Sequence, residues 1–161
     1  MRITICCVGK VKEKFYCQAI DEYSKRLSRY CKLEVKEVAD EKTPDNASDT
    51  VNDIIKAKEG ERLLSCIKDE APNAEADITG ISFEEDVLAS ARFNLNPSYN
   101  GKSDIVFVIG GSLGLDKRVL DRADFKLSFS PMTFPHQLMR VILLEQIYRS
   151  YRIMKNEPYH K

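Results

Sequence analysis

The feature that most constrains this chain is an apolar run, residues 105–109 (IVFVI), that leads directly into the glycine-rich segment 110–116 (GGSLGLD). Five β-branched or aromatic residues without polar alternation predict a strand buried on both faces, as in the middle of a parallel sheet. The glycines allow a sharp turn and a close approach to a ligand, and Asp116 can cap a helix that begins at Lys117. Ligands of parallel α/β sheets collect at the carboxyl ends of strands. This loop is therefore a candidate binding site, although an ordinary glycine-rich turn is the alternative, because phosphate-loop and dinucleotide motifs are missing.

Length and composition predict one soluble domain. A chain of 161 residues that is 43% hydrophobic can bury one core and is short for two, so we expect a single domain over residues 1–161. The apolar runs are much shorter than the roughly 18 residues of a membrane helix, and no secretory leader is visible, which predicts a cytoplasmic protein without membrane association. Five cysteines without a CxxC pair, with only two histidines, predict reduced thiols and no metal site.

The pattern of apolar residues predicts alternating strands and helices. Strands are expected at 2–8, 33–38, near 74–78, 105–109 and 125–129, and helices at 14–30, 49–68, 83–93, 117–123 and 135–154. Ser48 is the expected N-cap of the second helix, which Gly60 should interrupt or bend. Residues 94–104 should form a surface loop. The alternation predicts an α/β fold with a parallel sheet.

The last predicted helix is apolar around most of its circumference. The residues concerned are Leu138, Met139, Val141, Ile142, Leu143, Leu144, Ile147, Tyr148 and Tyr151. A sheet covers only one side of a helix, so a second copy of the chain is the simplest cover for the other side. We therefore expect a homodimer; the alternative is a central helix covered by its own domain.

The charge is balanced overall but basic at both ends. Residues 1–36 carry 9 Lys+Arg against 4 Asp+Glu, and residues 136–161 carry 5 against 2. If the two ends meet in space, they would form a basic face that attracts a polyanion. A solvated surface of mixed charge is the alternative.

Several motifs together resemble one family. They are Val8-Gly9-Lys10, Phe107-Val108-Ile109-Gly110-Gly111-Ser112 with Gly114-Leu115, Leu127-Ser128-Phe129-Ser130, Met132-Thr133-Phe134-Pro135-His136, Arg140 and Pro158-Tyr159-His160-Lys161. This set resembles the ribosomal RNA large subunit methyltransferase H family of SPOUT methyltransferases over nearly the whole chain, most weakly at residues 69–101.

The resemblance implies a parallel-sheet SPOUT fold with a C-terminal trefoil knot, S-adenosylmethionine as methyl donor and a homodimer. It also implies that the acceptor is N3 of a pseudouridine in the 23S rRNA of the assembled ribosome. The cofactor positions carried over are Ala76, Gly110, Phe129, Ser130, Pro131, Met132, Thr133 and Phe134. Three residues depart from the family pattern: Ala76 replaces a large aliphatic residue, Ile81 replaces a lysine, and Pro131 stands where proline is not expected.

Methyl transfer from a sulfonium is an in-line displacement, so the protein must mainly hold donor and acceptor in alignment. A group that accepts the N3 proton or stabilises the resulting anion would help, and His136, Arg140 and His160 are the candidates. We expect Arg140, Tyr159 and His160 to position the RNA, with the tail reaching the partner subunit's cofactor. The alternatives are a helix-start role for His136 and a disordered tail.

Phosphate contacts are expected from basic residues near both chain ends, because such contacts position RNA without reading its sequence. The residues are Lys10, Lys12, Lys14, Arg149, Arg152 and Lys155. Three other functions stay open: a SPOUT methyltransferase for another RNA, a ribosome- or RNA-binding protein that has lost turnover, and a nucleotide-binding module.

Overall fold

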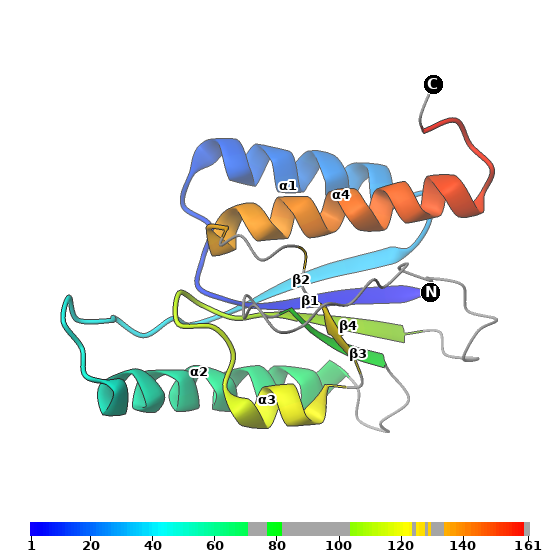
Figure 1. The fold of residues 1–161 in the computed structure, drawn as a ribbon. Helices are drawn as coiled ribbons and strands as arrows, with labels where there is room; N and C mark the ends of the chain where they lie inside the picture. Colours follow the sequence, from blue (N-terminus) through cyan, green and yellow to red (C-terminus); the bar gives the residue numbers. More distant parts are fainter. Residues whose placement is uncertain (71–76, 82–103, 124, 128, 130–133, 160–161) are drawn as a thin grey trace.

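The computed structural model describes residues 1–70, 77–81, 104–123, 125–127, 129 and 134–159. Its strands are β1 (Arg2–Val8), β2 (Lys32–Val38), β3 (Asp77–Ile81), β4 (Asp104–Ile109) and β5 (Phe125–Leu127). Its helices are α1 (Lys14–Leu27), α2 (Asp49–Glu70), α3 (Lys117–Arg122) and α4 (His136–Met154). The strands form one parallel sheet in the order β2-β1-β4-β3-β5. Helices α1 and α4 cover one face of the sheet and α2 and α3 the other (Figure 1).

The predicted α/β class with a parallel sheet is confirmed. Strands β1, β2 and β4 and all the described helices lie where the apolar pattern predicted them, within a few residues. Strand β3 begins at Asp77, later than the predicted 74–78. The predicted helix at 83–93 and most of the loop at 94–104 lie outside the described residues.

Strands β1 and β4 form the centre of the sheet, as the unbroken apolar run of β4 predicted. They pair in register, with Ile5 opposite Phe107 and Cys7 opposite Ile109. These four residues are at most 1% exposed and pack with α1 and α4. The alternate residues of both strands point to the other face, where Val108 packs in a second cluster beneath α2 and α3. Burial on both faces follows from the lack of polar alternation.

Helix α2 is continuous, so of the two predicted effects of Gly60, an interruption or a bend, the interruption is wrong. The glycine serves a contact instead. A Cβ at Gly60 would lie 2.5 Å from the Cβ of Asp116, which caps α3. The predicted N-cap is confirmed, because the Val51 N–H donates to Ser48 Oγ at 3.4 Å.

Helix α4 lies beside α1 on the sheet (Figure 1). It begins at His136, with Pro135 as the N-cap rather than in the first turn. Its buried face is formed by Met139, Arg140, Leu143, Leu144, Ile147 and Tyr151. At its end Ile153 is 56% exposed and Met154 38%. The homodimer stays a prediction.

The expectation that all cysteines are reduced is wrong for one pair. Cys6 on β1 and Cys66 on α2 form a disulfide, with their Cα atoms 6.7 Å apart. The sequence could not indicate this pair, since only the packing of α2 on the sheet brings the two residues together. Cys7, Cys17 and Cys31 are free thiols, and burial raises the pKa of Cys7 to about 11.

None of the helices within the described ranges is long and apolar enough to cross a bilayer. The same ranges contain no group of three or more side chains suited to hold a metal ion.

Candidate functional site

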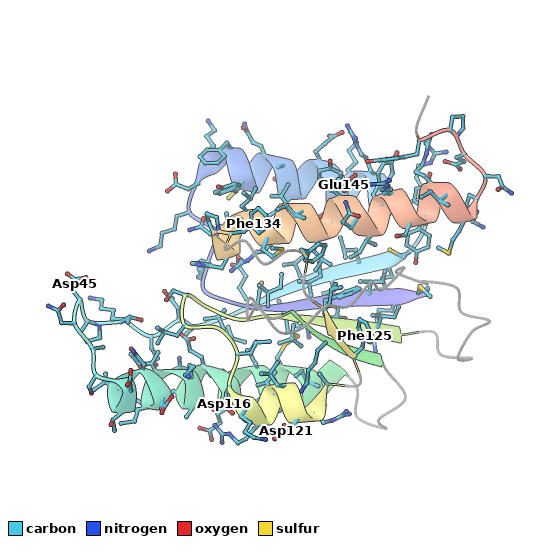
Figure 2. The ribbon with its side chains drawn as sticks, viewed as in Figure 1. Asp45, Asp116, Asp121, Phe125, Phe134 and Glu145 are labelled. Atoms are coloured by element: carbon cyan, nitrogen blue, oxygen red, sulfur yellow. A yellow bond between two sulfur atoms is a disulfide. The ribbon has the colours of Figure 1, made fainter. Side chains whose placement is uncertain are left out.

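The carboxyl edge of the sheet gathers the loops that the sequence singled out. Because the strands are parallel, Gly9 after β1, Asp40 after β2 and Gly110 after β4 all follow strand ends at this edge. The start of α4, with Phe134 just before it, lies at the same edge (Figure 2). This is the edge at which parallel α/β sheets bind ligands.

The loop after β4 is a closed turn. Gly111 and Gly114 form an isolated β-bridge, and the Gly114 N–H donates to the Gly111 carbonyl at 3.1 Å. A Cβ at Gly110 would lie 2.7 Å from the Gly114 carbonyl carbon and oxygen, so only glycine fits there. Gly114 has φ +83°, and a Cβ on it would meet nothing within 4 Å. One side of the turn is therefore tightly packed and the other is open.

Helix α2 supports this turn from behind. Asp116 stands just before α3 (Figure 2), and its carboxylate accepts the Arg118 backbone N–H at 2.8 Å, which confirms the predicted cap. Its side chain also packs against Gly60 of α2. The Arg118 guanidinium also donates to the Ala57 carbonyl at 2.8 Å. Burial raises the pKa of Asp116, but the hydrogen bonds and charge of Arg118 outweigh it and hold that pKa below the ordinary value. The loop between β4 and α3 is thus fixed to the middle of α2.

Glu59 on α2 is a member of this edge that sequence reasoning missed. Its side chain is 5% exposed, Oε1 accepts the Glu41 N–H at 3.0 Å, and Oε2 would lie 2.9 Å from a Cβ on Gly111. Burial raises the pKa of Glu59; the hydrogen bond from Glu41 opposes this rise and the charge of Asp40 adds to it. A signal was present in the sequence, because Glu59 falls four residues from both Ile55 and Leu63 and so interrupts an apolar stripe.

Arg140 holds the loop after β1 in place by hydrogen bonds. Its guanidinium donates to Glu37 Oε1 at 2.7 Å and to the carbonyls of Val8 and Gly9 at 2.7 and 2.8 Å. The residue is 1% exposed. We predicted that Arg140 positions the RNA directly, but the guanidinium is turned into the protein and bonded to its own chain. Any effect on the RNA must therefore act through the loop that it holds.

His136 lies in the first turn of α4 and is partly exposed. Desolvation lowers its pKa, the positive charge of Arg140 lowers it further, and Asp40 partly opposes the shift. The neutral imidazole, which can accept a proton, is therefore the favoured form near neutral pH.

The C-terminal tail packs against its own α4. The Tyr159 hydroxyl donates to the Glu145 carboxylate, its ring meets Tyr148 edge-on, and Arg149 lies 5.7 Å from the ring centroid. The contact with Glu145 raises the pKa of Tyr159 to about 12. Arg152 pairs with Glu157 at 3.0 Å. These contacts hold Tyr159 over the middle and C-terminal half of α4, away from the first turn of that helix.

The residues predicted to contact phosphates lie in two places, although the two ends of the chain do meet where Arg26 of α1 and Arg152 of α4 lie 5.8 and 5.9 Å from the Tyr148 ring centroid. Lys10 and Lys12 are exposed beside the carboxyl edge, whereas Arg149 and Arg152 lie near the far end of α4. Sixteen residues of helix separate His136 from Arg152, which corresponds to about 24 Å. Lys10 and Lys12 are therefore separated from Arg149 and Arg152 within one protomer, and the basic face stays a prediction.

Comparison with known proteins agrees with this arrangement. A family profile described as "Predicted SPOUT methyltransferase" matches residues 1–160. The chain belongs to the SPOUT methyltransferase family. Proteins named ribosomal RNA large subunit methyltransferase H are similar to it over 100% of both chains: 60% identical in Clostridium novyi and 56% in Clostridium kluyveri. A protein of Clostridium perfringens named ribosomal RNA large subunit methyltransferase H 1 is 58% identical over the same length.

The SPOUT assignment confirms the predicted family, and the structure locates part of the predicted SPOUT site. Gly110, Phe134, His136, Lys10 and Lys12 lie at or beside the carboxyl edge. Phe129 and Phe134 also pack against the core between the sheet and α4. Arg149 and Arg152 belong to the C-terminal half of α4, and Tyr159 packs over the middle and C-terminal half of that helix. The predicted residues outside the described ranges are Ala76, Ser130, Pro131, Met132, Thr133 and His160.

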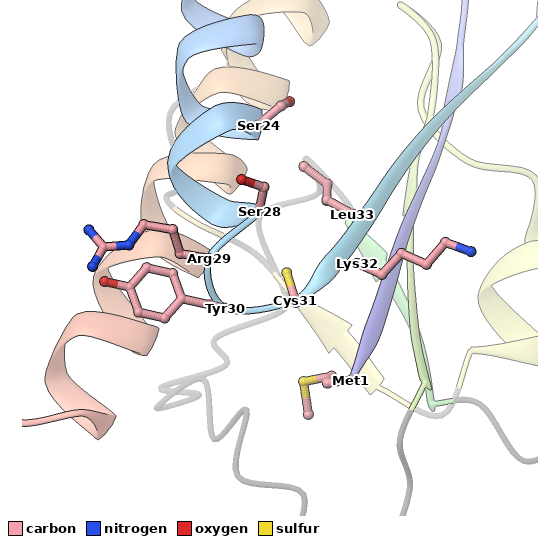
Figure 3. Close-up of a pocket in the computed structure, with 8 residues that line it drawn as sticks. All are labelled: Met1, Ser24, Ser28, Arg29, Tyr30, Cys31, Lys32 and Leu33. Carbon is pink, nitrogen blue, oxygen red and sulfur yellow. The ribbon is translucent and has the colours of Figure 1, made fainter.

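A hollow of about 680 Å³ lies at the other edge of the sheet, remote from the SPOUT candidate residues. It is lined by Met1, Ser24, Ser28, Arg29, Tyr30, Cys31, Lys32 and Leu33. Its two cations, Arg29 and Lys32, point away from one another (Figure 3). None of the residues that line this hollow belongs to the glycine turn. We therefore do not assign the hollow as the cofactor site, despite its volume.

Proposed function

We propose that this protein is a cytoplasmic methyltransferase that transfers a methyl group from S-adenosylmethionine to N3 of a pseudouridine in the 23S rRNA of the assembled ribosome. The observation that carries the proposal is the glycine turn at the carboxyl end of β4. This turn is tightly packed at Gly110, whereas a Cβ at Gly114 would meet nothing within 4 Å. The full-length similarity to proteins named as large-subunit rRNA methyltransferases supplies the class of substrate.

The residues present fit the cofactor. A turn without side chains on one face lets backbone N–H and C=O groups approach a ligand closely. In this proposal Gly110, Phe129 and Phe134 hold S-adenosylmethionine together with Ala76 and residues 130–133. The bound cofactor supplies an activated methyl group on a sulfonium. The protein then has mainly to align donor and acceptor and to exclude water.

His136 is the proposed acceptor of the N3 proton. It stands at the same edge as the glycine turn, and its lowered pKa leaves the imidazole neutral and able to take a proton. Arg140 acts as a positioning residue, because it fixes the carbonyls of Val8 and Gly9 next to Lys10.

The tail supports a homodimer. Tyr159 is held over the middle and C-terminal half of α4, away from the first turn at the carboxyl edge, so Tyr159 and His160 can serve a cofactor site most simply when that site belongs to the partner subunit. The same two-fold arrangement would bring Lys10 and Lys12 of one protomer near Arg149 and Arg152 of the other. The residues predicted to contact phosphates would then form one surface across the dimer. We propose that residues 1–161 form one domain whose C-terminal part is threaded as a trefoil knot.

The test is transfer of labelled methyl from S-adenosylmethionine to ribosomes from cells that lack the endogenous enzyme. Intact ribosomes, free large subunits and protein-free RNA are compared. The expected result is label at a pseudouridine of intact ribosomes, because a small domain needs its target presented by a larger assembly. Label in transfer RNA instead would favour a different substrate, and cofactor binding without any transfer would favour a protein that has lost turnover.

A further inference from the structure

Glu59 is a buried carboxylate on the α2 side of the glycine turn. Its side chain is 5% exposed, and no lysine or arginine forms an ion pair with it in the part of the chain that the structure describes. Burying an unpaired charge is costly in free energy, so proteins retain such a charge mainly at functional sites, where it interacts with a ligand or substrate.

The neighbouring charges do not neutralise Glu59 directly. Arg62 and Lys58 are both paired with Glu41, the latter at 3.6 Å, and Arg62 also donates to the Ala39 carbonyl at 2.9 Å. Asp40, after β2, adds a further negative charge at this edge. A net negative field therefore remains on the α2 side of the glycine turn.

The direction of the carboxylate points to the ligand that it serves. Oε1 of Glu59 accepts a hydrogen bond from the Glu41 N–H at 3.0 Å. Oε2 is directed at Gly111 and would lie 2.9 Å from a Cβ at that position. Gly111 belongs to the turn that carries the proposed cofactor site. An ion bound on the open side of that turn would feel the Glu59 charge through protein rather than through water, with little screening.

We propose that Glu59 determines donor specificity: its carboxylate supplies the negative charge that favours cationic S-adenosylmethionine over the demethylated product, S-adenosylhomocysteine. The inference rests on the proposed function. The two ligands differ by one methyl group and by the positive charge on sulfur. A charge behind the turn therefore discriminates between them, whereas a purely structural residue affects both alike.

The test compares ligand affinities by isothermal titration calorimetry in the wild type and in Glu59→Gln. Glutamine keeps the shape and can still accept the Glu41 N–H, but it removes the charge. Affinity for S-adenosylmethionine should fall about 10-fold or more, and that for S-adenosylhomocysteine should change less than about 3-fold. Removing a buried unpaired charge should leave the melting temperature of the free protein unchanged or raise it.

Two further variants complete the test. Glu59→Asp keeps the charge and should retain most of the wild-type preference even if both affinities fall. Glu61→Gln, at an exposed position on the same helix, is the matched control and should change neither affinity. Equal losses for both ligands in Glu59→Gln, or no loss for either, would overturn the inference while leaving the proposed function intact. A folded wild type that binds neither ligand would overturn the proposed function, and this inference with it.

Discussion

Replacing Gly60 by alanine tests whether α2 supports the glycine turn. In an ordinary helix interior this change stabilises by about 0.5–1 kcal/mol, because glycine loses more backbone entropy on folding. Here the new Cβ would lie 2.5 Å from the Cβ and 3.1 Å from the Cγ of Asp116. The Cβ of Asp116 is fixed to its backbone and cannot rotate away, so α2 and the β4–α3 loop must separate.

The expected magnitude follows from two opposing effects. Overpacking a well-packed contact costs about 1–3 kcal/mol. After the gain in helix propensity is subtracted, Gly60→Ala should lower the free energy of unfolding by about 0.5–2 kcal/mol. For a domain of this size that is a drop of about 2–6 °C in melting temperature. The displaced Asp116 should also disturb the Gly111–Gly114 bridge and weaken donor binding.

Urea unfolding and donor titration of the same variant measure both effects. Glu61→Ala is the matched control, because it adds a good helix former at an exposed neighbouring position and should change stability by less than about 0.5 kcal/mol. A Gly60→Ala protein that is more stable than the wild type and binds the donor normally would refute the reasoning.

Three further predictions concern the site and the tail. Arg140→Met should destabilise the protein by about 3–5 kcal/mol in denaturant unfolding, since it removes the cation paired with Glu37 and the donor to the Val8 and Gly9 carbonyls. A stability near that of the wild type would contradict the view that Arg140 holds the loop after β1. His136→Asn should flatten the acid side of the stability profile, because the lowered folded-state pKa of His136 makes the wild type lose stability as the pH falls below about 6.5. The melting temperatures of both proteins are measured from pH 8 to 5, and a constant difference between them over this range would contradict the prediction. His160→Ala should reduce methyl transfer to ribosomes while donor affinity stays within about 2-fold of the wild type, and unchanged turnover would remove the tail from the mechanism.

The fold was predictable where its signals are local. The unbroken apolar run of β4 and the helical spacing of apolar residues in α1 each follow from the environment of one element. The poor composition of residues 74–78 left β3 misplaced, because neighbouring strands rather than its own residues determine where it pairs. Gly60 was taken for an interruption because helix propensity is local, whereas its partner Asp116 lies 56 residues away in the chain.

The candidate site was predictable in its location but not in its charges. Gly110 and Asp116 follow a recognisable strand, so the edge could be named from the sequence. The place of Glu59 in an apolar stripe marks it in the sequence as unusual, but its position beside Gly111 depends on the packing of α2 beneath the turn. The separation of Lys10 from Arg152 follows from the direction in which α4 runs across the sheet, which no composition of the chain ends reveals.

The hydrogen bonds of Arg140 also bear on the order in which the molecule assembles. They join residues 131 and 132 positions apart, and no shorter-range contact described here replaces them. Such long-range contacts form late, because the entropy of closing a long loop must be overcome first. A growing chain can therefore pair its first strands before the Val8 and Gly9 carbonyls have a donor. The loop after β1 at the carboxyl edge would be completed only after the start of α4, with Arg140, has left the ribosome. The protein would therefore become able to bind its ligands only at the end of its folding.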